Sequence, residues 1–137
     1  MKTNKIIILF ISIIIVMIGG YFVYSHNQKV NLAQHYYEIG EYKKASDLKI
    51  KSISDKVRML NIAQNWRSDL GNDEDLYTTI MLVGDEIKAY KNTDSNYVDK
   101  LEVYYQSIAN NFNISTNRLD DIGAMSSSEG TLAVKNL

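Results

Sequence analysis

Few side chains in this sequence are spaced to bind a metal ion. His35 and Glu38 are three residues apart and would share one face of a helix. His26 lies nine residues before His35, and no third ligand follows at a suitable spacing. The acidic run at residues 73–75 lacks the glycine and the final glutamate of a calcium-binding loop, so we expect it in the first turn of a helix. We therefore predict no metal site.

The sequence also lacks the motifs of common catalytic and cofactor sites. It contains no cysteine, which excludes disulfides, thiolate ligands and a cysteine nucleophile. It has no phosphate-binding P-loop, no G-x-S-x-G nucleophile turn and no glycine-rich nucleotide turn. We therefore predict no catalytic residues, no cofactor and no enzymatic activity. The net charge of −1 argues against binding of nucleic acid.

Tyrosine is the residue type that points to binding. Eight tyrosines follow residue 25, and most coincide with apolar positions at helical spacing, where we expect them to fill a core. Tyr37 and Tyr105 each follow a second tyrosine that takes such a position, so we expect these two side chains at the surface. Because tyrosine is favoured in protein interfaces, Tyr37 and Tyr105 are the candidate partner-binding residues.

The elements that must position these residues begin with one long apolar segment. Residues 6–24 carry no charge, and at 1.5 Å per residue they span about 28 Å, close to the ~30 Å hydrocarbon core of a bilayer. Tyr21, Phe22 and Tyr24 at the end of the segment suit the headgroup boundary. We predict a transmembrane helix that anchors the chain in a lipid bilayer.

The lysines that flank this segment predict its orientation. Lys2 and Lys5 precede it and Lys29 alone follows closely, which favours a cytoplasmic N-terminus at residues 1–5 and an extracytoplasmic C-terminal part. The expected location is a cell membrane, crossed once. A cleaved signal peptide is the alternative, because residues 6–18 have the length of a signal-peptide core and Gly19-Gly20 could end it.

Apolar residues at helical spacing predict an all-α domain over residues 25–125, followed by a flexible tail at 126–137. The predicted helices cover residues 30–39, 42–70, 72–90 and 97–112, with a short piece at 118–125. Gly40 and Gly71 follow the first two helices as stop signals. The alternating pattern of a strand is missing, and the absence of proline is typical of long helices.

Residues 32–45 resemble the tetratricopeptide repeat, a helix–turn–helix unit of about 34 residues. The matching positions are Leu32, Ala33, Tyr36, Gly40, Tyr42 and Ala45. The match ends there: Lys29 stands where the family usually has tryptophan, Lys49 and Ser52 replace an aromatic and a small residue, and the closing proline is absent. The resemblance implies an antiparallel helical hairpin with a surface that suits peptide binding. An ordinary helical hairpin is the alternative.

A weaker resemblance is to the LemA proteins, which are also anchored at the N-terminus and carry a helical extracytoplasmic bundle. Residues 42–48, Tyr-Lys-Lys-Ala-Ser-Asp-Leu, are similar to the basic run that precedes Asp-Leu in that family. The proline expected shortly afterwards is missing.

Charge is distributed unevenly over the part that follows the apolar segment. Residues 25–67 carry eight lysines and arginines against four acidic residues, whereas residues 68–137 carry five against twelve. This pattern indicates either two solvated faces or a basic half that lies near anionic headgroups or an acidic partner.

Together these features predict a membrane-anchored helical module for protein–protein interaction, an adaptor or complex subunit at the outer face of a bacterial membrane. The high content of Ile, Asn and Lys is what we expect of a bacterial chain. Its partner would be a protein, a peptide or a second copy of the chain, because about three repeats are normally needed for a stable solenoid. The alternative is a small protective membrane protein that confers bacteriocin immunity or phage superinfection exclusion.

Overall fold

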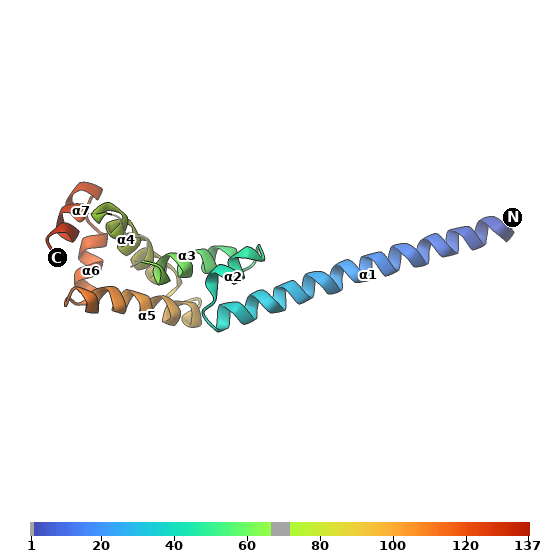
Figure 1. Ribbon diagram of the computed structural model, residues 1–137, viewed down its shortest axis with the longest axis horizontal. Helices are drawn as coiled ribbons and strands as arrows, with labels where there is room; N and C mark the ends of the chain where they lie inside the picture. The colour runs from blue at the N-terminus through green and yellow to red at the C-terminus, as the bar shows by residue number, and fades with distance from the viewer. Residues whose placement is uncertain (1, 67–71) are drawn as a thin grey trace. The chain divides into compact units, whose positions relative to one another are not determined.

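The structure, a computed structural model, describes residues 2–66 and 72–137. Over these residues the protein is all-helical and has no strand, which confirms the predicted fold class. The helices are α1 (Lys2–Glu38), α2 (Tyr42–Asp47), α3 (Ser54–Gln64), α4 (Asp73–Tyr90), α5 (Ser95–Asn111), α6 (Thr116–Gly123) and α7 (Ser127–Lys135) (Figure 1). They form two compact units, an N-terminal unit (Met1–Ser54) and a C-terminal unit (Asp55–Leu137). The first hairpin thus belongs with the apolar segment, whereas the sequence grouped it with the later helices.

Helix α1 is long and apolar enough to cross a membrane, with a mean hydropathy of 2.9 in its most apolar window. The large apolar side chains of residues 6–24 lie on the outside, with exposed fractions from 47% at Ile13 to 72% at Val16. The Ser12 hydroxyl donates a hydrogen bond to the Ile8 carbonyl at 2.8 Å, so this hydroxyl in the middle of the run is satisfied within the helix. A helix that satisfies its own polar groups is the element that a bilayer core accepts.

The predicted hairpin at residues 32–45 is present in the N-terminal unit. Gly40 adopts a positive φ of 81°, a conformation that side chains with a Cβ disfavour, and this allows the tight turn between α1 and α2. Ala33 and Ala45 are fully buried, and the rings of Tyr37 and Tyr42 meet edge to face with their centroids 6.3 Å apart. The hairpin is therefore closed by small residues, as the sequence indicated, but the ring that packs on Tyr42 is that of Tyr37 and not that of Tyr36, the position that matched the repeat. Its membership of a repeat family stays a prediction.

The prediction of a single helix over residues 42–70 is wrong for the residues of this range that the structure describes. Helix α2 ends at Asp47, and α3 begins only at Ser54. The break follows from local backbone chemistry: Lys49 takes a positive φ of 52°, and the Ser54 hydroxyl donates to the Lys51 carbonyl at 3.2 Å, which competes with helical pairing. The predicted end at Leu70 and the stop signal Gly71 lie outside the described residues.

The C-terminal unit is arranged around α4, against which α5, α6 and α7 all pack. A short turn joins α4 to α5 as antiparallel neighbours, and α6 leads from the end of α5 toward α7 (Figure 1). Both long helices begin at side-chain caps: Asn72 accepts from the Asp75 amide at 2.8 Å, and Asp94 accepts from the Tyr97 amide at 3.1 Å. The acidic residues 73–75 occupy the first turn of α4, as the sequence predicted.

The flexible tail predicted at residues 126–137 is corrected by helix α7. Ser126 caps this helix by accepting from the Glu129 amide, and Val134 and Gly130 are buried. Gly130 lies directly against the ring of Tyr77 on α4: a Cβ built on it would be 2.0 Å from the nearest ring carbon. The Tyr77 hydroxyl in turn donates to the Met125 carbonyl at 2.6 Å. The tail is held because a glycine lets α7 approach α4 closely.

We expect Gly130→Ala to destabilise the C-terminal unit by about 1–3 kcal/mol, because the added methyl group would overlap the Tyr77 ring. Elsewhere in a helix the same change stabilises by up to about 1 kcal/mol, so the predicted sign is the reverse of the ordinary one. Urea unfolding of the full chain in detergent, followed by fluorescence of the single tryptophan, Trp66, measures the difference. Ser128→Ala on the exposed side of α7 is the control. Equal stability of Gly130→Ala and wild type would contradict the packing.

Lys56 joins α3 to the turn between α4 and α5. Its ammonium group pairs with the Asp94 carboxylate and lies 5.5 Å and 5.3 Å from the ring centroids of Tyr90 and Tyr97. These two rings meet edge to face at 5.2 Å, and the Tyr97 hydroxyl donates to Glu86 at 2.8 Å. The hydrogen bond from Lys56, followed by that from the Tyr97 amide, lowers the pKa of Asp94 below its usual value. The ionised form of Asp94 therefore stabilises the fold.

This lowered pKa predicts an acid-dependent contribution to stability. The contribution of Asp94 is fully present above the ordinary aspartate pKa of about 4 and is lost as the pH falls through its lower, folded-state pKa. Asp94→Asn should cost about 1 kcal/mol at neutral pH, and its difference from wild type should vanish toward pH 2. Urea unfolding over this pH range tests the prediction, with the exposed Asp99→Asn on the same helix as control. A difference that is constant with pH would refute the role of the charge.

Candidate functional site

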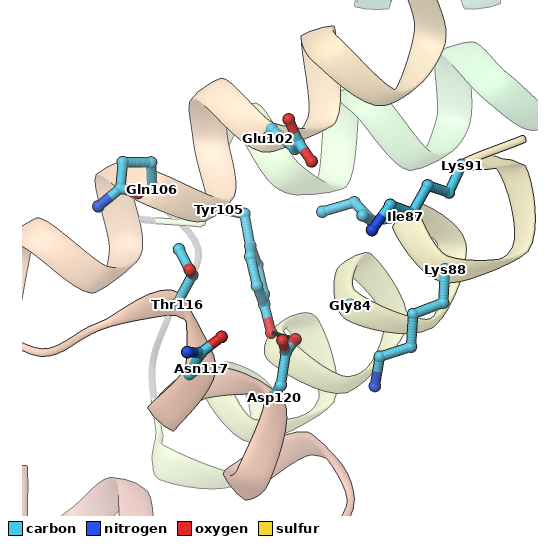
Figure 2. A pocket seen from close by; sticks show the side chains of 10 residues that line it. All are labelled: Gly84, Ile87, Lys88, Lys91, Glu102, Tyr105, Gln106, Thr116, Asn117 and Asp120. Atoms are coloured by element: carbon cyan, nitrogen blue, oxygen red, sulfur yellow. Dashed lines mark hydrogen bonds between the residues drawn. The ribbon is translucent and has the colours of Figure 1, made fainter. Parts of the chain in front are cut away.

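One polar cleft lies within the C-terminal unit, between the second half of α4, the middle of α5 and the start of α6. Its volume is about 460 Å³. Lys88 and Lys91 extend from the α4 side, whereas Gln106 and Asn117 lie on the side of α5 and α6 (Figure 2). The remaining lining residues are Gly84, Ile87, Glu102, Tyr105, Thr116 and Asp120.

The base of the cleft is fixed by one hydrogen bond between α5 and α6. The Tyr105 ring reaches from α5 toward α6 (Figure 2), and its hydroxyl donates to Asp120 Oδ1 at 2.8 Å. Gly84 of α4 makes room for this contact, because a Cβ there would lie 3.0 Å from the Tyr105 hydroxyl oxygen and 3.7 Å from Asp120 Oδ1. Three helices therefore meet at this point, and the glycine on α4 relieves crowding against the Tyr105 hydroxyl.

Burial of Tyr105 has an electrostatic consequence. The loss of water around its hydroxyl raises the pKa of Tyr105 far above its usual value of 10. The hydrogen bond to Asp120 and the negative charges of Asp120 and Asp85 raise it further. Tyr105 is therefore neutral at physiological pH and acts as a fixed hydrogen-bond donor.

The structure corrects the surface assignment of the two candidate tyrosines. Tyr37 is only 6% exposed and Tyr105 only 4% exposed, whereas their neighbours Tyr36 and Tyr104 are half-buried. On α5 the buried face follows Tyr97, Leu101, Tyr105 and Ile108, so the register is one residue later than the pattern that favoured Tyr104. Tyr105 still belongs to the candidate site, because it lines the cleft from below; Tyr37 packs in the N-terminal hairpin.

The other residues weighed as metal ligands have ordinary surroundings. Glu38 accepts a hydrogen bond from Gln34 Nε2 at 2.9 Å, and the ring of His35 lies 6.0 Å from that of Tyr36. In the part of the chain that the structure describes, no three histidine, aspartate or glutamate side chains come together in a way that could hold a metal ion.

Comparison of the chain with protein-family models, curated proteins and solved structures gave no match. Its function is therefore inferred from the geometry of the chain itself.

The chemistry of the cleft suits recognition of a polar partner. Small-molecule sites of comparable volume are lined mainly by apolar and aromatic side chains, whereas this lining is mostly polar. Lys88 and Lys91 offer positive charge, and Glu102 and Asp120 offer negative charge. The side-chain amides of Gln106 and Asn117 each supply a donor and an acceptor, the same pair that a peptide group presents. A peptide segment that carries both charges would find complementary groups here.

We expect Tyr105→Phe to lower the free energy of unfolding by about 1 kcal/mol at neutral pH, since it removes the donor to Asp120. Because folding raises the pKa of Tyr105, its contribution is fully present below pH 10 and is lost as the pH rises further toward the folded-state value. The difference between wild type and variant should therefore shrink above pH 10. Urea unfolding from pH 7 to 11 measures it, and Tyr36→Phe, at a half-buried tyrosine of the N-terminal hairpin, is the control. A difference that grows at high pH would disprove this account.

Proposed function

We propose that this protein is a membrane-anchored interaction module. In this proposal residues 6–24 cross the membrane with the N-terminus in the cytoplasm, and the C-terminal unit binds a protein or peptide partner outside it. The cleft between α4, α5 and α6 is the observation that carries the binding role, since it joins opposite charges and peptide-like amides on a fixed frame. The exposed apolar surface of α1 supports the anchor.

The orientation of the chain is part of the proposal. Lys2 and Lys5 precede the apolar run, and Lys29 lies five residues beyond its end at Tyr24. This difference favours retention of the N-terminal side in the cytoplasm. Helix α1 continues without a break from Lys2 to Glu38, so the span and the hairpin that follows it share one rigid element. That continuity supports an uncleaved anchor.

A binding role fits the properties of the side chains in the cleft better than a catalytic one. Catalytic acids and bases work best with a pKa near the operating pH, whereas the environment of Tyr105 moves its pKa away from neutrality. The Tyr105 hydroxyl already donates a hydrogen bond to Asp120, and this bond fixes both side chains. The pair therefore holds the shape of the cleft. The more exposed residues Lys88 and Lys91 are left to contact a partner, together with the side-chain carbonyl of Gln106, whose nitrogen donates to Asn110 at 2.8 Å.

Site-specific crosslinking in intact membranes tests this proposal. A photoreactive amino acid at Gln106 should give a crosslinked product of defined mass that is absent when the same group replaces Glu74, an exposed residue at the other end of α4. Charge reversal at the cleft, Lys88→Glu with Lys91→Glu, should lower the yield about tenfold, because partner charges would then be repelled. Arg118→Glu with Lys135→Glu, at two exposed positions outside the cleft lining, changes the net charge by the same amount and is the control. Equal labelling from positions 74 and 106, or no effect of the reversal, would count against the cleft.

A further inference from the structure

The hairpin of the N-terminal unit has a cluster of lysines close to the end of the apolar span. Helix α1 is continuous, so Lys29 lies five residues and about 7.5 Å beyond Tyr24 along its axis. The headgroup region of a bilayer extends about 5–8 Å beyond the hydrocarbon core on each side. If residues 6–24 fill the core, Lys29 is level with the outer edge of the headgroups.

The turn at Gly40 brings the next segment back toward the same level. The Glu41 amide donates to the Tyr36 carbonyl at 2.9 Å, and α2 folds back along α1 from the aromatic pair Tyr37–Tyr42 (Figure 1). Tyr37 lies about 20 Å beyond Tyr24, and the six residues of α2 return about 9 Å of that distance. The segment that follows α2 is therefore about 11 Å from the hydrocarbon boundary, within reach of long side chains directed at the headgroups.

The lysines of this hairpin differ in whether they form ion pairs and in how far they lie from the apolar span. Next to the turn, Lys44 lies 3.8 Å from Glu41 and over the Tyr36 ring, and Lys43 in the first turn of α2 lies 3.6 Å from Asp47 at the end of that helix. Lys29, Lys49 and Lys51 are exposed and form no ion pair among the described residues. The positive charge that is not balanced within the hairpin therefore lies at the end nearer the span.

The backbone conformation of Lys49 is a second observation that suggests a role for this residue beyond folding. It follows α2 with a positive φ of 52°, a left-handed conformation that glycine usually supplies at a helix end. A lysine in this conformation is strained, because its Cβ approaches the backbone too closely. Backbone strain of this kind tends to accumulate at functional positions. The chain thus places a long cation where a glycine would satisfy the backbone better.

We propose that Lys29, Lys49 and Lys51 form a contact surface for anionic lipid headgroups and hold the hairpin against the membrane. This inference rests on the proposed anchor and assigns a partner to a face that the cleft does not use. Phosphate groups are the complementary chemistry, and an attraction of this kind acts over about one Debye length, roughly 8–10 Å at physiological salt.

The absence of cysteine from the chain allows a direct test with one label. Ser52→Cys places a fluorophore on the exposed segment beside Lys51 in the full-length protein, reconstituted in vesicles. Quenching by a nitroxide on the lipid headgroup should be about twofold stronger when roughly a third of the phosphatidylcholine is replaced by phosphatidylglycerol, and about 1 M salt should remove the increase. Equal quenching in neutral and anionic vesicles would overturn the inference.

Two double variants separate this surface from general charge effects. Lys49→Gly with Lys51→Gln should abolish the lipid-dependent increase, and glycine at position 49 relieves the backbone strain, so the hairpin should remain folded. Lys43→Gln with Lys44→Gln removes the same charge near the turn and should leave the increase intact; an equal loss in both variants would refute the assignment.

Alkaline extraction of the vesicles distinguishes the proposed anchor from the proposed lipid-contact surface. Release of the protein would overturn the anchor and this surface together, whereas retention with equal quenching in both lipids would overturn the surface alone.

Discussion

The C-terminal unit depends on the close approach of three helices to α4. The chain has no cysteine, so disulfides cannot contribute and the unit must be held by packing and hydrogen bonds. Gly130 allows α7 to lie against the Tyr77 ring, and Gly84 leaves space for the Tyr105 hydroxyl where α5 meets α6. The same constraint shapes the cleft, because a side chain at position 84 would crowd the hydroxyl that Tyr105 directs at Asp120. Close packing of the helices on α4 therefore both stabilises the unit and forms the candidate site.

The sequence predicted the elements whose apolar pattern is long, and failed where short local features decide the backbone. α1, α4 and α5 appear at or near their predicted positions, since several turns of amphipathic or apolar sequence determine them. The break after α2 depends on the single positive φ of Lys49, for which residue type gave no warning. α7 has too few apolar residues for periodicity, although Ser126 followed three residues later by Glu129 is a capping pattern that would have indicated a helix start.

The candidate site was beyond the reach of the sequence for a geometric reason. Gly84, Ile87, Lys88 and Lys91 recur at three- and four-residue steps, so their common face on α4 was readable. Which helices this face would meet depends on packing across the unit, and a single sequence does not specify it. The choice between Tyr104 and Tyr105 shows how sensitive such predictions are: adjacent residues point about 100° apart on a helix, so one step in register exchanges core and surface.

The distribution of charge gives the two units different tasks. In the N-terminal unit, Glu41 and Asp47 are paired with lysines of α2, whereas the lysines that form no ion pair among the described residues lie toward the span, an arrangement that suits a membrane surface. In the C-terminal unit acidic residues predominate, and the lysines of the cleft, Lys88 and Lys91, face carboxylates across it. An anionic bilayer would repel such a unit overall, so its cleft is better suited to a soluble or protein-borne ligand than to lipid. The proposed lipid contact and the proposed partner site therefore use different residues and different electrostatics, and each can be changed without altering the other.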